Sequence, residues 1–138
     1  MYEPGEVKVV AYKNGEKWAE DVVHTTGAAA DILLKPDHTT IAANGDDLSY
    51  ITVTIADKDG QMVPRSKNPL HFEISGPGEI VAVDNGDPTN LESFQSKDRN
   101  AFNGLCLVIV RSTRQAGSIT LKASSPNLKA AEVSVTAK

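Results

Sequence analysis

Apolar and polar residues alternate in short runs along most of this chain. In the segment 49–57, residues 50, 52 and 54 are Tyr or Thr, whereas Ile51, Val53 and Ile55 are aliphatic. Alternation with a period of two predicts a strand with one buried and one exposed face. The segment 117–124 shows the same period. No stretch of ten or more residues shows a helical period, so the pattern predicts an all-β protein.

The predicted strands follow one another at intervals of about 8 to 12 residues, separated by Gly, Pro, Asn and Asp, as in β-sandwiches. They are 31–36, 49–57, 61–64, 71–76, 79–84, 104–113, 117–124 and 130–137. We therefore expect an immunoglobulin-like antiparallel β-sandwich over residues 28–138. The segment 104–113 lacks clean alternation, which predicts a central strand covered on both sides for part of its length.

Two further runs, 6–13 and 16–25, flank Asn14-Gly15, and this arrangement is the strongest short-range signal of a β-hairpin. A lone two-stranded hairpin is only marginally stable in water, so its apolar residues must pack on something else. We interpret residues 1–27 as the tail of a preceding immunoglobulin-like domain plus a linker. The open edge of the hairpin favours self-association of the isolated chain, and packing of the hairpin on its own sandwich is the alternative.

A polar, turn-rich segment from Asp84 to Asn103 directly precedes the most apolar strand. It exceeds the roughly 12 to 15 residues beyond which irregular loops are uncommon in compact domains. We expect it to fold over the end of the sandwich, with the rings of Phe94 and Phe102 capping the core. The alternative is an interdomain or recognition loop. Its candidate residues are Asn85, Gly86, Asp87, Pro88, Phe94, Phe102 and Asn103.

The composition excludes some classes of partner. The 138 residues carry a net charge of −4 and no basic patch, so binding to nucleic acid is not expected. The longest apolar run, Leu105 to Val110, is far shorter than the roughly 20 residues that cross a bilayer, so no membrane insertion is expected. The first ten residues show no secretory signal pattern. The single cysteine, Cys106, lies among aliphatic residues and is predicted to be buried and inert.

The titratable residues form no recognisable catalytic, metal or cofactor site. Three carboxylate pairs lie close in sequence, each beside Gly or Pro, where Asp side chains bind nearby backbone N–H groups. They are Asp46/Asp47, Asp57/Asp59 and Asp84/Asp87. A weak calcium site at one of these turns is the alternative. The three histidines, His24, His38 and His71, are scattered without metal-ligand spacing.

The sequence resembles the C-terminal region of bacterial β-galactosidases of glycoside hydrolase family 2. The resemblance covers essentially the whole chain and rests on three features. They are "VDNGDP" at 83–88, "FNGLCLVIVRS" at 102–112, and Asn44-Gly45-Asp46-Asp47 upstream. The resemblance implies a parent enzyme that hydrolyses β-galactosides or related β-glycosides with retention, and that in Gram-negative bacteria is periplasmic or secreted. The catalytic carboxylates of that family lie in a (β/α)8 barrel, and no residue here matches them.

We therefore expect a non-catalytic C-terminal domain that contacts other domains or subunits of its parent. Two alternatives stay open. A carbohydrate-binding module would present exposed aromatic rings to sugars, and aromatic residues are only 5% of this chain. An adhesin-type spacer shares the pattern of Asp57-Lys58-Asp59-Gly60 followed by Val63-Pro64.

Overall fold

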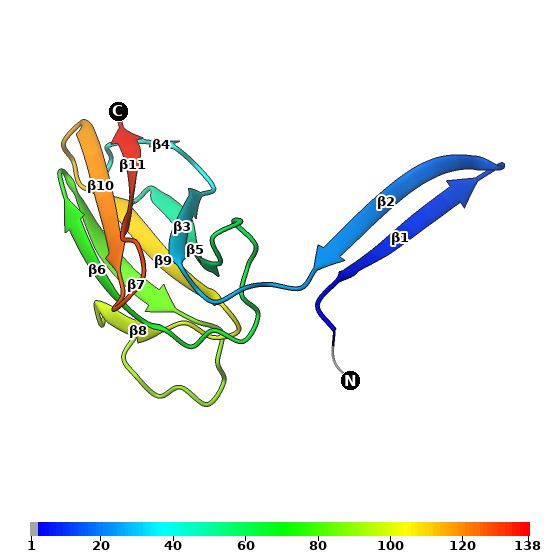
Figure 1. The fold of residues 1–138 in the computed structure, drawn as a ribbon. Coiled ribbons are helices and arrows are strands. Elements are labelled where there is room, and N and C mark those ends of the chain that lie inside the picture. The colour runs from blue at the N-terminus through cyan, green and yellow to red at the C-terminus, as the bar shows by residue number, and fades with distance from the viewer. Residues whose placement is uncertain (1–2) are drawn as a thin grey trace.

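The computed structural model describes residues 3–138, and every regular element in this part is a β-strand (Figure 1). The strands are β1 (Glu6–Lys13), β2 (Glu16–His24), β3 (Asp31–Pro36), β4 (Thr40–Ile41), β5 (Leu48–Ala56), β6 (Pro69–Ser75), β7 (Gly78–Asp84), β8 (Asp98–Asn100), β9 (Leu105–Ser112), β10 (Gly117–Ser124) and β11 (Ala131–Ala137). No helix among these residues could span a membrane.

The strands from β3 onward form two sheets that face each other, which confirms the predicted sandwich (Figure 1). One sheet has the order β3-β5-β9-β7, and the other has the order β4-β11-β10-β6-β8. All neighbouring strands are antiparallel except β11 and β4, which are parallel.

The core lies between the two sheets and is made of aliphatic side chains around Phe72, which is fully buried. Ile51, Val53 and Ile55 of β5 point into it, as their alternation predicted. On average a buried side chain of this size contributes about 1.5–3 kcal/mol to folding. The core therefore accounts for the stability of the sandwich without any disulfide, since Cys106 is a free thiol.

Strand β9 is central, as predicted, and lies between β5 and β7. Its inward residues, including Val108 and Val110, are fully buried, whereas its outward residues are half-buried or exposed. The prediction that β9 is covered on both sides is therefore only partly right, because its outer face is not fully buried. The expected strand at 61–64 is wrong: Met62 makes only one isolated bridge, to Ala56, because Pro64 cannot continue a ladder.

The hairpin β1–β2 extends away from the sandwich (Figure 1). Asn14 and Gly15 both have positive φ, at 54° and 83°, which confirms the predicted turn. A bulge follows Ala11. At the base of the hairpin, the N–H of Gly5 donates to Oγ1 of Thr25 at 3.0 Å. The two strands thus pair with each other along their whole length without resting on the sandwich.

Candidate interdomain surface

One face of the hairpin is apolar and open to solvent. Val7 lies directly opposite Val23, and Val9 follows Val7 on the same face. These three side chains are 68%, 64% and 63% exposed, respectively. Trp18, near the hairpin tip, is 72% exposed, and the Lys13 ammonium lies 5.8 Å from the centre of its ring. Contiguous exposed apolar side chains of this kind are typical of protein–protein contact surfaces.

The opposite face of the hairpin is covered by its own charged side chains. The Nζ of Lys8 lies 2.9 Å from a carboxylate oxygen of Glu20, and Lys17 contacts the same oxygen. These two ammonium groups, Lys17 first, lower the pKa of Glu20. Val10 and Val22 lie half-buried beneath this charged layer. The two faces therefore differ in composition. Ion pairs of Lys8, Lys17 and Glu20 cover much of one face, which also carries the exposed Tyr12. The other face carries the exposed valines, with one charged residue, Asp21, opposite Val9.

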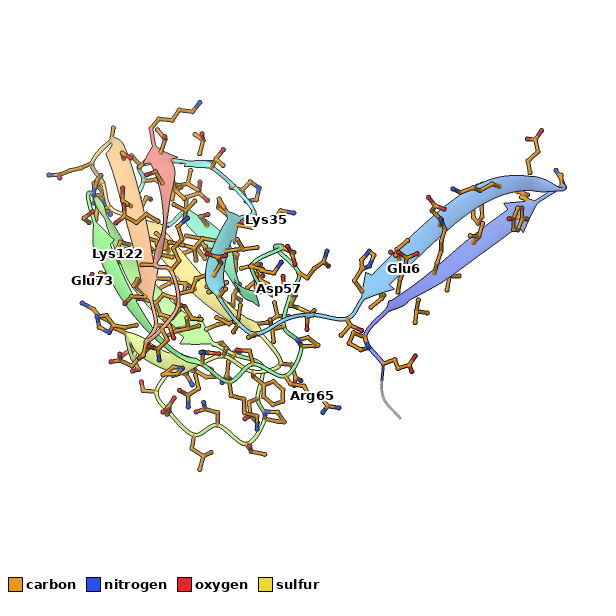
Figure 2. The ribbon with its side chains drawn as sticks, in the orientation of Figure 1. Glu6, Lys35, Asp57, Arg65, Glu73 and Lys122 are labelled. Carbon is orange, nitrogen blue, oxygen red and sulfur yellow. The ribbon has the colours of Figure 1, made fainter. Side chains whose placement is uncertain are left out.

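The hairpin is joined to the sandwich by a fixed linker. The buried carboxylate of Asp57 accepts hydrogen bonds from the backbone N–H groups of Gly27, Asp59 and Gln61, at 2.7, 3.0 and 2.9 Å. These bonds, that of Gly27 first, lower the pKa of Asp57. The N–H of Ala30 also donates to the carbonyl of Ala56. Figure 2 shows Asp57 at the end of the sandwich where the linker enters.

Arg99 organises the long loop, and the sequence reading missed it. It lies on β8, a short strand inside the segment expected to be irregular, and is only 2% exposed. Its guanidinium donates to the carbonyl of Ser93 at 2.7 Å and to that of Glu92 at 3.4 Å. Burying a cation is costly unless it is well partnered, so these contacts hold the loop in one shape from beneath. One atom, the Nε of Arg99, has no hydrogen-bond partner among residues 3–138.

Phe94 does not cap the core, so that expectation is wrong. Its side chain is 58% exposed, and its ring lies 5.7 Å from the Arg99 guanidinium carbon. Ala101, two residues after Arg99, belongs to the core, and both residues are buried. Phe102 is half-buried and its backbone bridges to Leu105. Leu91, which the sequence reading did not single out, is 96% exposed at the outside of the loop.

The remaining predicted loop residues shape the backbone. Asn85 is buried, donates from Nδ2 to the carbonyl of Asn100 at 2.9 Å, and accepts from the N–H of Asp87. Asp87 accepts from the N–H and hydroxyl of Thr89, and these bonds, the hydroxyl first, lower its pKa. Gly86 and Asn103 have positive φ, at 71° and 51°. Pro88 is exposed.

Four of the paired aspartates, Asp47, Asp57, Asp84 and Asp87, accept backbone N–H groups at turns, as predicted, whereas the carboxylate of Asp59 contacts the ammonium of Lys58. Asp47 accepts from the N–H of Ala42 at 2.7 Å, and Asp84 accepts from the N–H of Asn85 at the same distance. Within residues 3–138, no group of three or more His, Cys, Asp or Glu side chains is arranged to hold a metal ion. Each histidine lies beside one carboxylate, the shortest pair being His71 and Asp98 at 2.7 Å.

Cys106 is 3% exposed, which confirms its predicted burial. Its thiol lies 3.1 Å from the carbonyl oxygen of Asp84. Burial raises the pKa of the Cys106 thiol to about 12. A thiol that stays protonated at neutral pH is a poor nucleophile.

Comparison with known proteins shows what this arrangement resembles. The profile described as "Glycoside hydrolase family 2 C-terminal domain 5" matches residues 32–134. The chain is 38% identical to "Beta-galactosidase BoGH2A" of Bacteroides ovatus, over 99% of the chain but 16% of that protein. It is 30% identical to a β-glucuronidase of Formosa agariphila, over 99% of the chain and 14% of that protein.

Solved structures agree with these sequence matches. A glycosyl hydrolase family 2 member from Bacteroides cellulosilyticus superimposes with a TM-score of 0.93 at 33% identity, covering 99% of this chain and 18% of that one. A β-glycosidase from Bacteroides vulgatus gives a TM-score of 0.94 at 29% identity, covering 98% of this chain and 18% of that one. The chain thus spans about one sixth of the proteins named here, and the match includes the hairpin.

Proposed function

This chain belongs to the family of glycoside hydrolase family 2 C-terminal domains, and from that premise we propose that it is a non-catalytic accessory domain of a larger glycosidase. Its role in this proposal is structural: it attaches to the neighbouring domain of its parent through the β1–β2 hairpin. The hairpin completes a preceding immunoglobulin-like domain, and the domain boundary falls near residues 27 and 28.

The observation that carries this proposal is the contrast between the two faces of the hairpin. Val7, Val9 and Val23 are exposed on one face, whereas Lys8 and Glu20 finish the other. Two strands with a bare apolar face do not hold together alone in water. A neighbouring domain that lies on the bare face would bury these valines and stabilise the hairpin, which supports an interdomain role.

We propose that the parent hydrolyses β-galactosides, because the relatives named above include a β-galactosidase of 38% identity. A β-glucuronidase also matches, so the sugar is the less constrained part of this proposal. The full-length enzyme should therefore be assayed with nitrophenyl β-galactoside and nitrophenyl β-glucuronide in parallel. The proposal that the parent is exported rests on the family resemblance alone, and a signal sequence upstream in its gene would test it.

The isolated chain should hydrolyse neither substrate. Many of its acidic side chains bind turn backbone or form surface ion pairs, and retaining glycosidases need two carboxyl groups about 5 Å apart, one of them with a raised pKa. The assay uses the isolated chain at high concentration beside the full-length enzyme. Turnover that stays with the chain through repeated chromatography would contradict a non-catalytic role.

Deleting residues 1–27 tests the boundary. The sandwich from residue 28 should keep its thermal transition, because its core residues all lie beyond β2. We also propose that the exposed hairpin drives self-association of the isolated chain, so light scattering should show less association after the deletion. Unfolding of the shortened chain would mean that the hairpin is an integral part of the sandwich.

A further inference from the structure

Two large apolar side chains stand on the outside of the loop between β7 and β8. Leu91 is 96% exposed and Phe94 is 58% exposed. Scattered exposed apolar residues are common on soluble proteins, so exposure by itself shows little. Two further features of the loop, its rigidity and its position on the sandwich, indicate that these two side chains form a contact site.

The loop is held rigid from below. The buried Arg99 donates to the carbonyl of Ser93 at 2.7 Å, and its guanidinium lies against the ring of Phe94. The carbonyl of Phe94 in turn accepts from the N–H of Val83 at 2.6 Å, which ties the loop to the edge strand β7. A loop fixed on a rigid scaffold loses little conformational entropy when it binds, which favours recognition.

The loop lies at the same end of the sandwich as the hairpin (Figure 1). Asp31, the first residue of β3 after the linker, pairs with Ala56 at the end of β5. Next to it, the start of β9 pairs with the end of β5 and with the end of β7, where the loop begins. A polypeptide that packs at the base of the hairpin would therefore lie at the end of the sandwich that carries Leu91 and Phe94.

We propose that Leu91 and Phe94, here called the loop contact, dock against a segment of the same polypeptide that precedes residue 1. This inference rests on the proposed function, because it requires a larger parent. The matched family consists of C-terminal domains. The chain covers only 14–18% of the length of the relatives and structures cited. In this proposal, most of the parent therefore precedes the chain.

A second copy of the chain is the competing occupant, and the size of the loop contact argues against it. A stable interface between separate proteins buries about 1,200–2,000 Å² in total, far more than two side chains on one loop provide. Within one polypeptide the partner is already tethered, and a high effective concentration lets a small contact form. The loop contact thus fits an intramolecular site.

Photo-crosslinking in the full-length enzyme tests this proposal. A benzoylphenylalanine replaces Leu91, and in a matched control it replaces Gln115, an exposed residue between β9 and β10 at the opposite end of the sandwich. After irradiation, mass spectrometry identifies the linked peptides. We expect links from position 91 to peptides that precede residue 1, at the mass of a single chain and at several times the yield from position 115. Arg99→Met should lower that yield, because the loop loses its support.

Two outcomes would overturn the proposal: links from position 91 to a second copy of the chain, or a yield no higher than the control. The same probe at Val9 separates this proposal from the one on which it rests. If position 9 links to the preceding domain and position 91 does not, the hairpin proposal stands and the loop contact falls. If position 9 also fails to link, the accessory role itself is wrong.

Discussion

The backbone N–H of Gly27 donates a hydrogen bond to Oδ2 of Asp57 at 2.7 Å, and this contact joins the hairpin linker to the sandwich. The same carboxylate accepts from the turn that follows β5, so one side chain serves both segments. The linker, residues 25–30, consists of small residues, and its bonds at Gly27 and Ala30 restrict its conformation. The bond from Gly27 to Asp57 fixes the linker at Gly27 against the sandwich.

Replacing Asp57 with alanine should loosen the linker. The N–H groups of Gly27, Asp59 and Gln61 would lose their acceptor, so the thermal midpoint should fall by several degrees and the amide of Gly27 should exchange faster. Asp59→Ala is the control, because its carboxylate meets only the exposed Lys58. Equal effects of the two substitutions, measured by calorimetry and hydrogen exchange, would show that Asp57 is an ordinary turn residue.

The contribution of Asp57 should depend on pH in a defined direction. Hydrogen bonds from Gly27 and Gln61 lower its pKa in the folded chain. Its stabilising effect is therefore complete above the unfolded pKa, near 3.9, and is lost as the pH falls through the lower folded pKa. The difference in stability between the native chain and Asp57→Ala should be constant from pH 5 to 7 and shrink below about pH 4. A difference that grows on acidification would contradict this assignment.

Substitution by alanine should destabilise the fold to different extents at two glycines beside the loop, Gly86 and Gly104. Gly86 has φ of +71°, and no atom lies within 4 Å of the position that a Cβ would take. Gly86→Ala should therefore lower the free energy of unfolding by about 1–2 kcal/mol, from backbone strain alone. Gly104 has φ of +80°, and its Cβ would collide with the carbonyl oxygen of Val63. Gly104→Ala should therefore cost clearly more than Gly86→Ala in denaturant unfolding. Similar costs would mean that the backbone near Val63 yields easily.

Cys106 should be unreactive in the folded chain. Its pKa of about 12 implies that iodoacetamide labelling stays slow from pH 7 to 10, whereas an unfolded thiol ionises near pH 8.5. Cys106→Ser should cost only about 1 kcal/mol, because the carbonyl of Asp84 can accept from the new hydroxyl. Rapid labelling under native conditions, followed by mass spectrometry, would show that this strand opens.

The parts of the fold that could be predicted are those in which local pattern and burial agree. In β5, the alternation of Ile51, Val53 and Ile55 against Thr52 and Thr54 determines which face enters the core. The hairpin followed in the same way from Asn14-Gly15 between alternating runs. In both cases the local sequence is enough to predict the secondary structure and, for β5, which face is buried.

The loop could be predicted only in part, because its shape depends on distant partners. Arg99 reads as a surface cation in the sequence, and only the fold places the carbonyls of Glu92 and Ser93 around it. Phe94 turns outward, and its ring lies 5.7 Å from the guanidinium carbon of Arg99. Asp57 was correctly predicted as a turn residue, but its bond to Gly27, thirty positions away, has no local signal.

The most direct test of the account is the accessibility of Val9 in the isolated chain and in the full-length enzyme. Val9→Cys places a thiol on the bare face of the hairpin, and Lys8→Cys places a control on the opposite, charged face. Alkylation rates are followed peptide by peptide. We predict that both thiols react fast in the isolated chain when it is dilute enough to stay monomeric, and that only the thiol at position 9 becomes protected in the full-length enzyme. Equally fast reaction at position 9 in both proteins would contradict the claim that a neighbouring domain covers the hairpin.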